Sequence, residues 1–184
     1  MIHYILSVYL VMAFTSDPSG LKVGDQAPSF TAVDQFGEKV SLEESLKKGK
    51  VILTFYRGAW CRYCIKQFLE YQDSLYLIQA KGATLIAITP EHEDGVAKTT
   101  SISKATFSIL HDDQLQIMLS YKVISEEKVQ EYKSGYEKTG VDNQEKFLPV
   151  PATYIINQNG KIDFVYFDPN YRIRVTINEL LDHL

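Results

Sequence analysis

The sequence predicts an α/β fold in which a central mixed β-sheet is flanked by helices on both faces. Three short apolar runs, at 51–56, 83–88 and 107–110, are near-continuous, as in strands covered on both faces. Helical stretches separate these runs, which is typical of parallel strands. A hairpin around the turn 157–160 then adds antiparallel strands. At 184 residues the chain suits one domain that buries roughly 70% of its unfolded surface.

The first elements have recognisable turn and cap residues. A short hairpin within 21–42 turns at Gly37, and Ser41 with Glu44 forms a capping box that opens a brief helix ended by Gly49. After the strand at 51–56, a helix is expected over 65–80, which Gly82 stops.

The later elements follow in the same way. A polar surface helix is expected over 94–103, and a second helix over 114–121 with apolar residues on one face. The stretch 123–147 is polar and charged, and we interpret it as a long surface insertion. Thr176 and Glu179 form a capping box that opens the last helix.

The domain proper is expected at 21–184, preceded by an apolar segment at 1–20. Residues 2–14 hold no charged side chain, and their length fits the core of an export signal. A positively charged start is missing, and the length falls short of the roughly 20 residues of a spanning helix. Two interpretations stay open: an exported or membrane-tethered protein, periplasmic for example, or a cytoplasmic protein whose N-terminus packs on the domain.

Charge and cysteine content narrow the function classes. A net charge of -4 gives no general attraction for nucleic acid, so no nucleic-acid partner is expected. Two cysteines are too few for a disulfide-built scaffold. No metal is expected either, because the cysteine pair lacks a second pair of ligands and no histidine has ligand spacing to it.

The two cysteines, Cys61 and Cys64, stand three positions apart between an apolar strand and a predicted helix. Cysteines at i and i+3 can close a small disulfide, and the first thiol meets the positive end of the helix dipole. The thiolate attacks disulfides and peroxides, so the spacing predicts redox chemistry, with the Cys61 pKa near or below neutrality. The alternative is a pair of inert, buried thiols.

Several further stretches accompany this motif. They are 23–30, 55–64, 110–112, 148–157 with Gly160, and 168–174. In this order the chain resembles the alkyl hydroperoxide reductase/thiol-specific antioxidant family, the peroxiredoxins and their near relatives in the thioredoxin-like superfamily. The resemblance implies a thioredoxin-like fold with an N-terminal hairpin, and with an insertion before a strand that a cis-proline, Pro151, precedes.

The cysteine motif of this chain departs from the motif of the family that it resembles. Peroxiredoxins carry Pro-x-x-x-Thr-x-x-Cys plus a downstream arginine. In register, Arg57 takes the Pro position, Cys61 the Thr position and Cys64 the position of the peroxide-attacking cysteine. Pro151 stands where the arginine is expected. The resemblance therefore implies thioredoxin-like chemistry, in which Cys61 attacks and Cys64 resolves the mixed disulfide.

Five residues are expected to shape the site around the two catalytic cysteines. They are Trp60, Arg57, Arg62, Pro151 and Thr153. Arg57 and Arg62 would support the thiolate, and Trp60 would shield it or belong to the core. Arg172 and Arg174 are expected to be structural or surface residues.

Three functions remain open. The first is an oxidoreductase that reduces disulfides, and the second is a thiol-dependent peroxidase with an antioxidant role. Both would use a redox-active disulfide between Cys61 and Cys64, need no further cofactor, and be recharged by a thioredoxin-type protein or a small thiol. The third is a binding domain in which the disulfide is structural. The sequence leaves the oligomeric state open.

Overall fold

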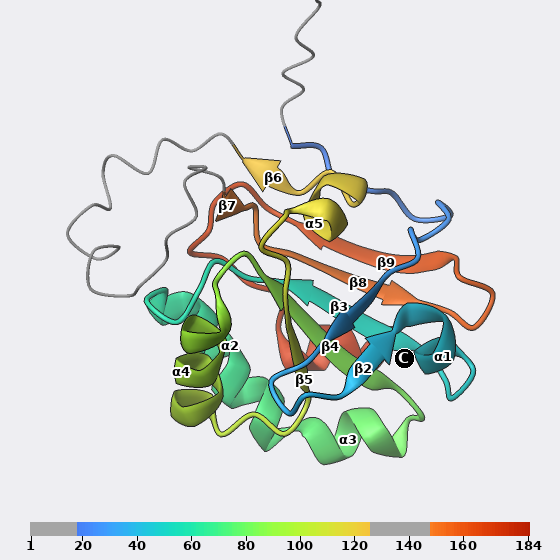
Figure 1. Ribbon diagram of the computed structural model, residues 1–184. Coiled ribbons are helices and arrows are strands. Elements are labelled where there is room, and N and C mark those ends of the chain that lie inside the picture. The colour runs from blue at the N-terminus through green and yellow to red at the C-terminus, as the bar shows by residue number, and fades with distance from the viewer. Residues whose placement is uncertain (1–17, 126–147) are drawn as a thin grey trace, which may run out of the picture.

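The computed structural model describes residues 18–125 and 148–184, and its centre is a five-stranded sheet in the order β5-β4-β3-β8-β9 (Figure 1). β3, β4 and β5 run parallel, whereas β8 and β9 join antiparallel. The sheet is therefore mixed, as predicted. Its strands are β3 (Val51–Phe55), β4 (Thr84–Thr89), β5 (Ser108–His111), β8 (Ala152–Ile156) and β9 (Ile162–Phe167).

The side chains of the central strand β3 pack in two separate cores, because they alternate between the two faces of the sheet. Leu53 and Phe55 pack in one core, with side chains of α1 (Leu42–Leu46) and α5 (Gln116–Ser120). Ile52 belongs to the other core, together with both cysteines. Four helices line that second face: α2 (Arg62–Asp73), α3 (Leu75–Ala80), α4 (Glu93–Ser103) and α7 (Ile177–Asp182). Both faces are thus covered, which explains the unbroken apolar character of β3.

The helix predicted over 65–80 is two helices. α2 ends at Asp73 and α3 begins at Leu75, because Ser74 between them leaves helical geometry at φ -106° and ψ 6°. The start also differs from the prediction, since α2 begins at Arg62. This earlier start makes Cys61 the N-cap and puts Cys64 in the first helical turn.

The predicted hairpin and caps are confirmed. β1 (Thr31–Val33) pairs antiparallel with β2 (Lys39–Ser41), and the Ser41 hydroxyl then accepts the Glu44 amide at 3.5 Å. At the other end of the chain the Thr176 hydroxyl accepts the Glu179 amide at 3.2 Å. α1 ends at Leu46, with Lys47 as its C-cap, rather than at Gly49.

The expected cis-proline is wrong, since every peptide bond in the described residues is trans, including the one before Pro151. Two separate strands, β7 (Leu148–Pro149) and β8, lie on either side of Val150 and Pro151. β7 pairs with β6 (Ile124–Ser125), and the Val150 amide donates to the carbonyl of Val123 at 2.7 Å. The chain is already extended here, and the trans isomer of an X-Pro bond is favoured by about 0.5–1 kcal/mol.

Two predicted segments lie largely outside the described residues: 1–17 of the apolar N-terminus and 126–147 of the insertion. Within 18–125 and 148–184, no helix is both long and apolar enough to cross a bilayer.

Candidate active site

The two cysteines lie where β3 ends and α2 begins. Cys61 caps the helix, and its carbonyl accepts the Cys64 amide at 2.9 Å. Both thiols are free, and both are buried, with 4% of Cys61 and none of Cys64 exposed. The turn from Gly58 to Cys61 is closed by a hydrogen bond of 3.1 Å, which the Cys61 amide donates to the Gly58 carbonyl. The structure therefore presents two neighbouring thiols beneath the surface.

Gly58 is required at this turn by its backbone and by its surroundings. Its φ of +144° is one that L side chains rarely adopt. A Cβ at this position would lie 2.5 Å from the carboxyl carbon of Glu91 and 2.6 Å from Nε1 of Trp60. The absent side chain therefore lets a carboxyl group and an indole approach the turn that carries the cysteines.

Arg174 contacts both sulfurs. Its Nη2 lies 3.4 Å from Sγ of Cys64 and 4.0 Å from Sγ of Cys61. Nη1 donates to the carbonyls of Tyr171 and Ile173, which fixes the guanidinium over the thiols. The expectation that Arg174 is a structural or surface residue is wrong. The segment between β9 and α7 folds back over the start of α2 and brings this cation to the site.

The lower thiol pKa belongs to Cys64. Burial opposes its thiolate, but the hydrogen bond from Cys61, the charge of Arg174 and the Arg57 backbone amide outweigh it and lower the pKa to about 6. The pKa of Cys61 is raised, because its thiol is hydrogen-bonded to the Cys64 sulfur and because it is buried. These directions oppose the prediction of a low pKa at Cys61: within the pair, which titrates as a unit, the favoured thiolate is Cys64, the sulfur nearer to Arg174.

A buried carboxyl group supports the same turn. Glu91 is fully buried just after β4, and its Oε2 accepts the Ala59 amide at 2.7 Å. The pKa of Glu91 is raised to about 7. Burial is the main cause and the charge of Cys64 adds to it, whereas the hydrogen bond from the Ala59 amide opposes the rise. Sequence reasoning missed Glu91. The available signal was its place after a buried strand, since the carboxyl ends of parallel neighbours such as β3 and β4 meet at one edge.

Arg57 is buried beside aromatic rings. Its guanidinium carbon lies 4.3 Å from the ring centroid of Tyr171 and 5.2 Å from that of Trp60. Trp60 is half-buried at the same place. The two predicted neighbours of the thiols are thus brought together, and Tyr171, from the C-terminal segment, joins them.

Arg62 takes another direction. It is exposed at the start of α2, where its Nη2 donates to the Tyr63 hydroxyl at 2.7 Å and its guanidinium carbon lies 4.8 Å from that ring. Arg174 rather than Arg62 therefore supplies the guanidinium hydrogen bonds to the sulfurs.

Pro151 and Thr153 belong to the strand next to β3. Phe55 pairs with Ala152, so Pro151 lies at the edge of the sheet from which the cysteine turn leaves. Thr153 is buried deeper, with its hydroxyl 3.0 Å from that of Thr54. It supports the sheet below the site and belongs to a buried polar cluster.

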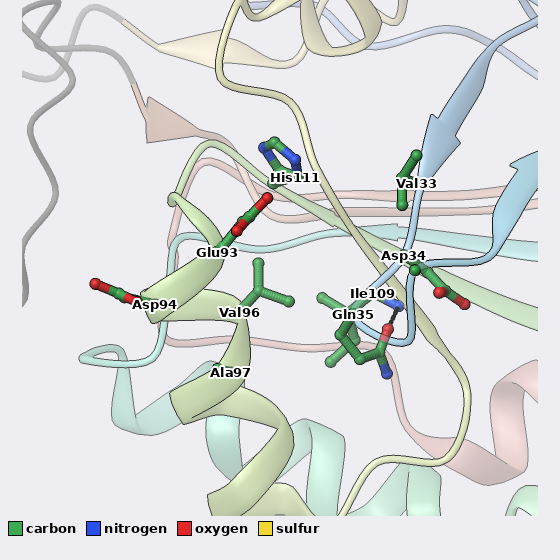
Figure 2. A pocket seen from close by; sticks show the side chains of 10 residues that line it. Val33, Asp34, Gln35, Glu93, Asp94, Val96, Ala97, Ile109 and His111 are labelled. Atoms are coloured by element: carbon green, nitrogen blue, oxygen red, sulfur yellow. Dashed lines mark hydrogen bonds between the residues drawn. The ribbon is translucent and has the colours of Figure 1, made fainter.

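A pocket of about 410 Å³ lies elsewhere, between the β1 end and α4 (Figure 2). Its lining includes Asp34 and Gln35 but neither cysteine. Asp34 accepts the Ser108 hydroxyl at 2.9 Å, and Gln35 accepts the Ile109 amide at 2.7 Å. These polar groups are used within the fold, so the pocket adds nothing to the thiol site. No group of three or more potential metal ligands occurs among the described residues.

A mixed sheet with a dithiol at the start of the helix after its central strand defines the class of thioredoxin-like thiol oxidoreductases. A family model described as the AhpC/TSA family matches residues 23–165. The chain belongs to this family, which confirms the resemblance seen in the sequence.

Relatives in sequence carry two kinds of name. A protein of Mycobacterium tuberculosis named as a peroxiredoxin is 28% identical over 144 residues, which cover 77% of this chain and 82% of the relative. A thiol-disulfide oxidoreductase ResA of Bacillus thuringiensis is 33% identical over 155 residues, which cover 83% of this chain and 74% of the relative. The chain is therefore an oxidoreductase, and both predicted activities agree with these relatives.

Solved structures confirm the fold. Peroxidoxin BcpB from Mycobacterium tuberculosis superposes with a TM-score of 0.70 at 20% identity, covering 89% of this chain and 96% of that one. The thioredoxin domain of a thiol-disulfide oxidoreductase from Bacteroides vulgatus gives 0.60 at 20% identity, covering 83% and 93%. The predicted thioredoxin-like fold is thus confirmed.

Proposed function

We propose that the protein reduces hydroperoxides, with Cys64 as the attacking thiolate and Cys61 as the resolving thiol. One observation carries the proposal: the guanidinium of Arg174 lies 3.4 Å from the sulfur of Cys64. The low pKa of Cys64 agrees with this role, as burial is outweighed there by the Cys61 hydrogen bond and by the charge of Arg174.

The surroundings of Cys64 replace the groups that the peroxiredoxin motif would supply. Arg174 brings a cation from the C-terminal segment, although Pro151 occupies the motif's arginine position. The Cys61 thiol is hydrogen-bonded to the Cys64 sulfur, and it stands at the position of the motif's threonine hydroxyl. The residue changes that favour disulfide chemistry in the sequence are therefore offset by groups from other places in the chain.

Access favours a small electrophile. Cys64 is fully buried, so its sulfur becomes accessible only when the turn moves, and the small terminal oxygen of a hydroperoxide needs a smaller movement than a protein disulfide does. A thiolate held beneath a guanidinium also attracts an oxygen substrate, because the same cation stabilises the negative charge that develops when the O–O bond breaks.

The reaction balances with the two thiols alone. The Cys64 thiolate attacks the terminal oxygen of ROOH, the O–O bond breaks, and the RO⁻ that leaves takes up a proton to become ROH. Cys64 is then a sulfenic acid, and the Cys61 sulfur attacks it and expels water as the disulfide closes. A thioredoxin-type protein or a small thiol supplies two electrons to restore the dithiol.

Disulfide reduction is the second candidate. Cys61 favours it, because it is the more exposed of the two thiols, at 4% against none, and it caps a helix of 12 residues. In this reaction Cys61 attacks the substrate disulfide and Cys64 resolves the mixed disulfide. The two candidates differ in which sulfur reacts first.

Stopped-flow fluorescence of Trp60, the single tryptophan, tests the proposal on the reduced full-length protein. Hydrogen peroxide should change the fluorescence in a fast second-order phase that is lost in Cys64→Ser. Oxidation no faster than that of a free thiol, together with fast reaction with a peptide disulfide, would overturn the proposal and support the second candidate.

A further inference from the structure

Glu91 is a buried carboxyl group that the chemistry of the thiols, as described, does not use. Its side chain has no exposed surface, and it lies between the turn that carries the cysteines and the start of α4. Oε2 accepts the Ala59 amide at 2.7 Å, whereas Oε1 is buried without a hydrogen-bond partner among the described residues. An unpartnered polar atom costs free energy in a protein interior, and the cost is larger when the group is charged.

Two glycines leave the room that this carboxyl group fills. A Cβ at Gly95, near the start of α4, would lie 2.7 Å from both Cβ and Cδ of Glu91. A Cβ at Gly58, in the turn, would lie 2.5 Å from Cδ. The helix side is held by the backbone hydrogen bonds of an 11-residue helix, whereas the turn is attached to Glu91 through the Ala59 amide. The turn is therefore the side that moves more easily.

The closed turn opposes ionisation of Glu91. Burial is the main cause of its pKa of about 7, and the charge of Cys64 adds to it, whereas the Ala59 hydrogen bond and the charge of Lys98 favour the carboxylate. Tyr56, which follows β3, is buried and also interacts with the charge of Glu91. Ionisation strengthens the Ala59 hydrogen bond, but burial outweighs this gain. Contact with water relieves the ionised carboxylate, and movement of the turn provides that contact.

We propose that Glu91 controls access to the two thiols: when its carboxyl group ionises, the turn from Gly58 to Cys61 moves away from it and the sulfurs become accessible. Cys64 has no exposed surface in the closed turn, so opening precedes its reaction. Resting on the proposed peroxide reduction, the consequence is that each Cys64 thiolate reacts faster with peroxide above the pH at which Glu91 ionises. Glu91 is a positioning residue here, because it acts through the turn.

The direction of the pH effect follows from the proton balance. In the closed turn Glu91 keeps its proton up to a pH of about 7, whereas a carboxyl group in water releases it near 4.5. Opening therefore releases a proton between these values, and rising pH favours the open turn. The difference of about 2.5 pH units limits the gain in the opening constant to roughly 300-fold, for a Glu91 that is fully hydrated in the open turn.

Hydrogen–deuterium exchange of the amides at 58–61 measures this opening. Cys64 also titrates near neutral pH, so the measurement uses the Cys61→Ser, Cys64→Ser variant, in which no thiol titrates. After correction for intrinsic exchange rates, the opening constant of the turn should rise about tenfold between pH 5 and pH 8. Adding Glu91→Gln should abolish the rise, because the amide is neutral at both pH values and can still accept the Ala59 amide.

Two controls separate this effect from others. Glu93→Gln removes an exposed carboxyl group two residues further along the chain and should leave the rise in place. The turn at 157–161, where the Gly160 amide donates to the Asn157 carbonyl at 2.8 Å, should open equally at both pH values. An equal rise in both turns would overturn the proposal, and so would a constant value at 58–61 or a rise that survives Glu91→Gln.

Alkylation of the reduced wild-type protein by iodoacetamide measures access at the thiols themselves. Dividing the rate by the thiolate fraction, taken from thiolate absorbance, leaves the contribution of access. This quotient should rise severalfold from pH 6 to pH 8 in wild type and stay constant in Glu91→Gln. Neither measurement uses a peroxide, so the proposal stands if peroxide reduction fails while the quotient rises through Glu91. A constant quotient in wild type would overturn it, whatever the reaction with peroxide.

Discussion

Arg174 and Cys64 are 110 residues apart in the chain, yet the guanidinium of one lies 3.4 Å from the sulfur of the other. The contact exists because the segment between β9 and α7 crosses the start of α2. It places a positive charge beside a buried thiol, and this charge lowers the pKa of Cys64.

Replacing Arg174 by Gln should raise the pKa of Cys64. Burial then opposes the thiolate with only the Cys61 hydrogen bond and the Arg57 amide to offset it. Titration of thiolate absorbance at 240 nm should show the lower midpoint moving up by about 1 pH unit. Lys66→Gln is the control, because it removes an exposed cation that has an ion pair with Glu70. Equal midpoints for wild type and R174Q would contradict the role of Arg174.

Glu91→Gln should change how stability depends on pH. Burial raises the pKa of Glu91 from 4.5 to about 7, so the folded protein binds the proton more tightly than the unfolded chain does. Stability therefore falls as pH rises from about 4.5 to 7, and the variant lacks this loss. The Gln can still accept the Ala59 amide.

Thermal unfolding at pH 5 and pH 8 measures the effect. Relative to wild type, the Glu91→Gln variant should gain stability at pH 8 by an amount on the order of 1–3 kcal/mol. Exposed Glu93→Gln should show no such dependence. If the difference in the free energy of unfolding between wild type and E91Q is the same at both pH values, the pKa of Glu91 is not raised in the folded protein.

Gly58→Ala should destabilise the cysteine turn by about 2–3 kcal/mol, since its φ of +144° disfavours a side chain and the Cβ would meet Glu91 and Trp60. Gly37→Ala is a matched control: its φ is +81°, and a Cβ there has nothing within 4 Å. Urea unfolding should give a larger loss for Gly58→Ala. Equal losses would mean that backbone strain alone matters.

Thr153→Val should cost about 1–2 kcal/mol, because it removes the partner 3.0 Å from the Thr54 hydroxyl in the core. Thr54→Val should cost a similar amount. The double variant should cost less than the sum, because each single variant already removes the one hydrogen bond that the two hydroxyls share. Additive losses in urea unfolding would show that the two hydroxyls act independently.

Local patterns in the sequence predicted most of the fold. The apolar runs predicted the strands, and Ser41 and Thr176 predicted the helix caps. The spacing of Cys61 and Cys64 predicted thiol redox chemistry at the start of a helix. These signals depend on neighbours in the chain. The break at Ser74 was missed, because no glycine or proline marks it.

The surroundings of the thiols depend on contacts between residues far apart in the chain, which no local sequence pattern predicts. Arg174 and Glu91 reach the site from a C-terminal segment and from the end of β4, and no spacing links them to Cys64. The prediction of a low pKa at Cys61 rested on the helix N-terminus and on the cations of Arg57 and Arg62. In the structure the hydrogen bond between the two thiols favours the thiolate at Cys64, and the charge of Arg174, which lies nearer to that sulfur, adds to this effect.

The most direct test of the account is which sulfur a peroxide oxidises first. Each single variant, Cys61→Ser and Cys64→Ser, is reduced, exposed to one equivalent of hydrogen peroxide with dimedone present, and analysed by mass spectrometry for the trapped sulfenic acid. The account predicts rapid labelling at Cys64 in Cys61→Ser and little labelling in Cys64→Ser. Rapid labelling at Cys61 in Cys64→Ser, with Cys64 unlabelled in Cys61→Ser, would contradict it.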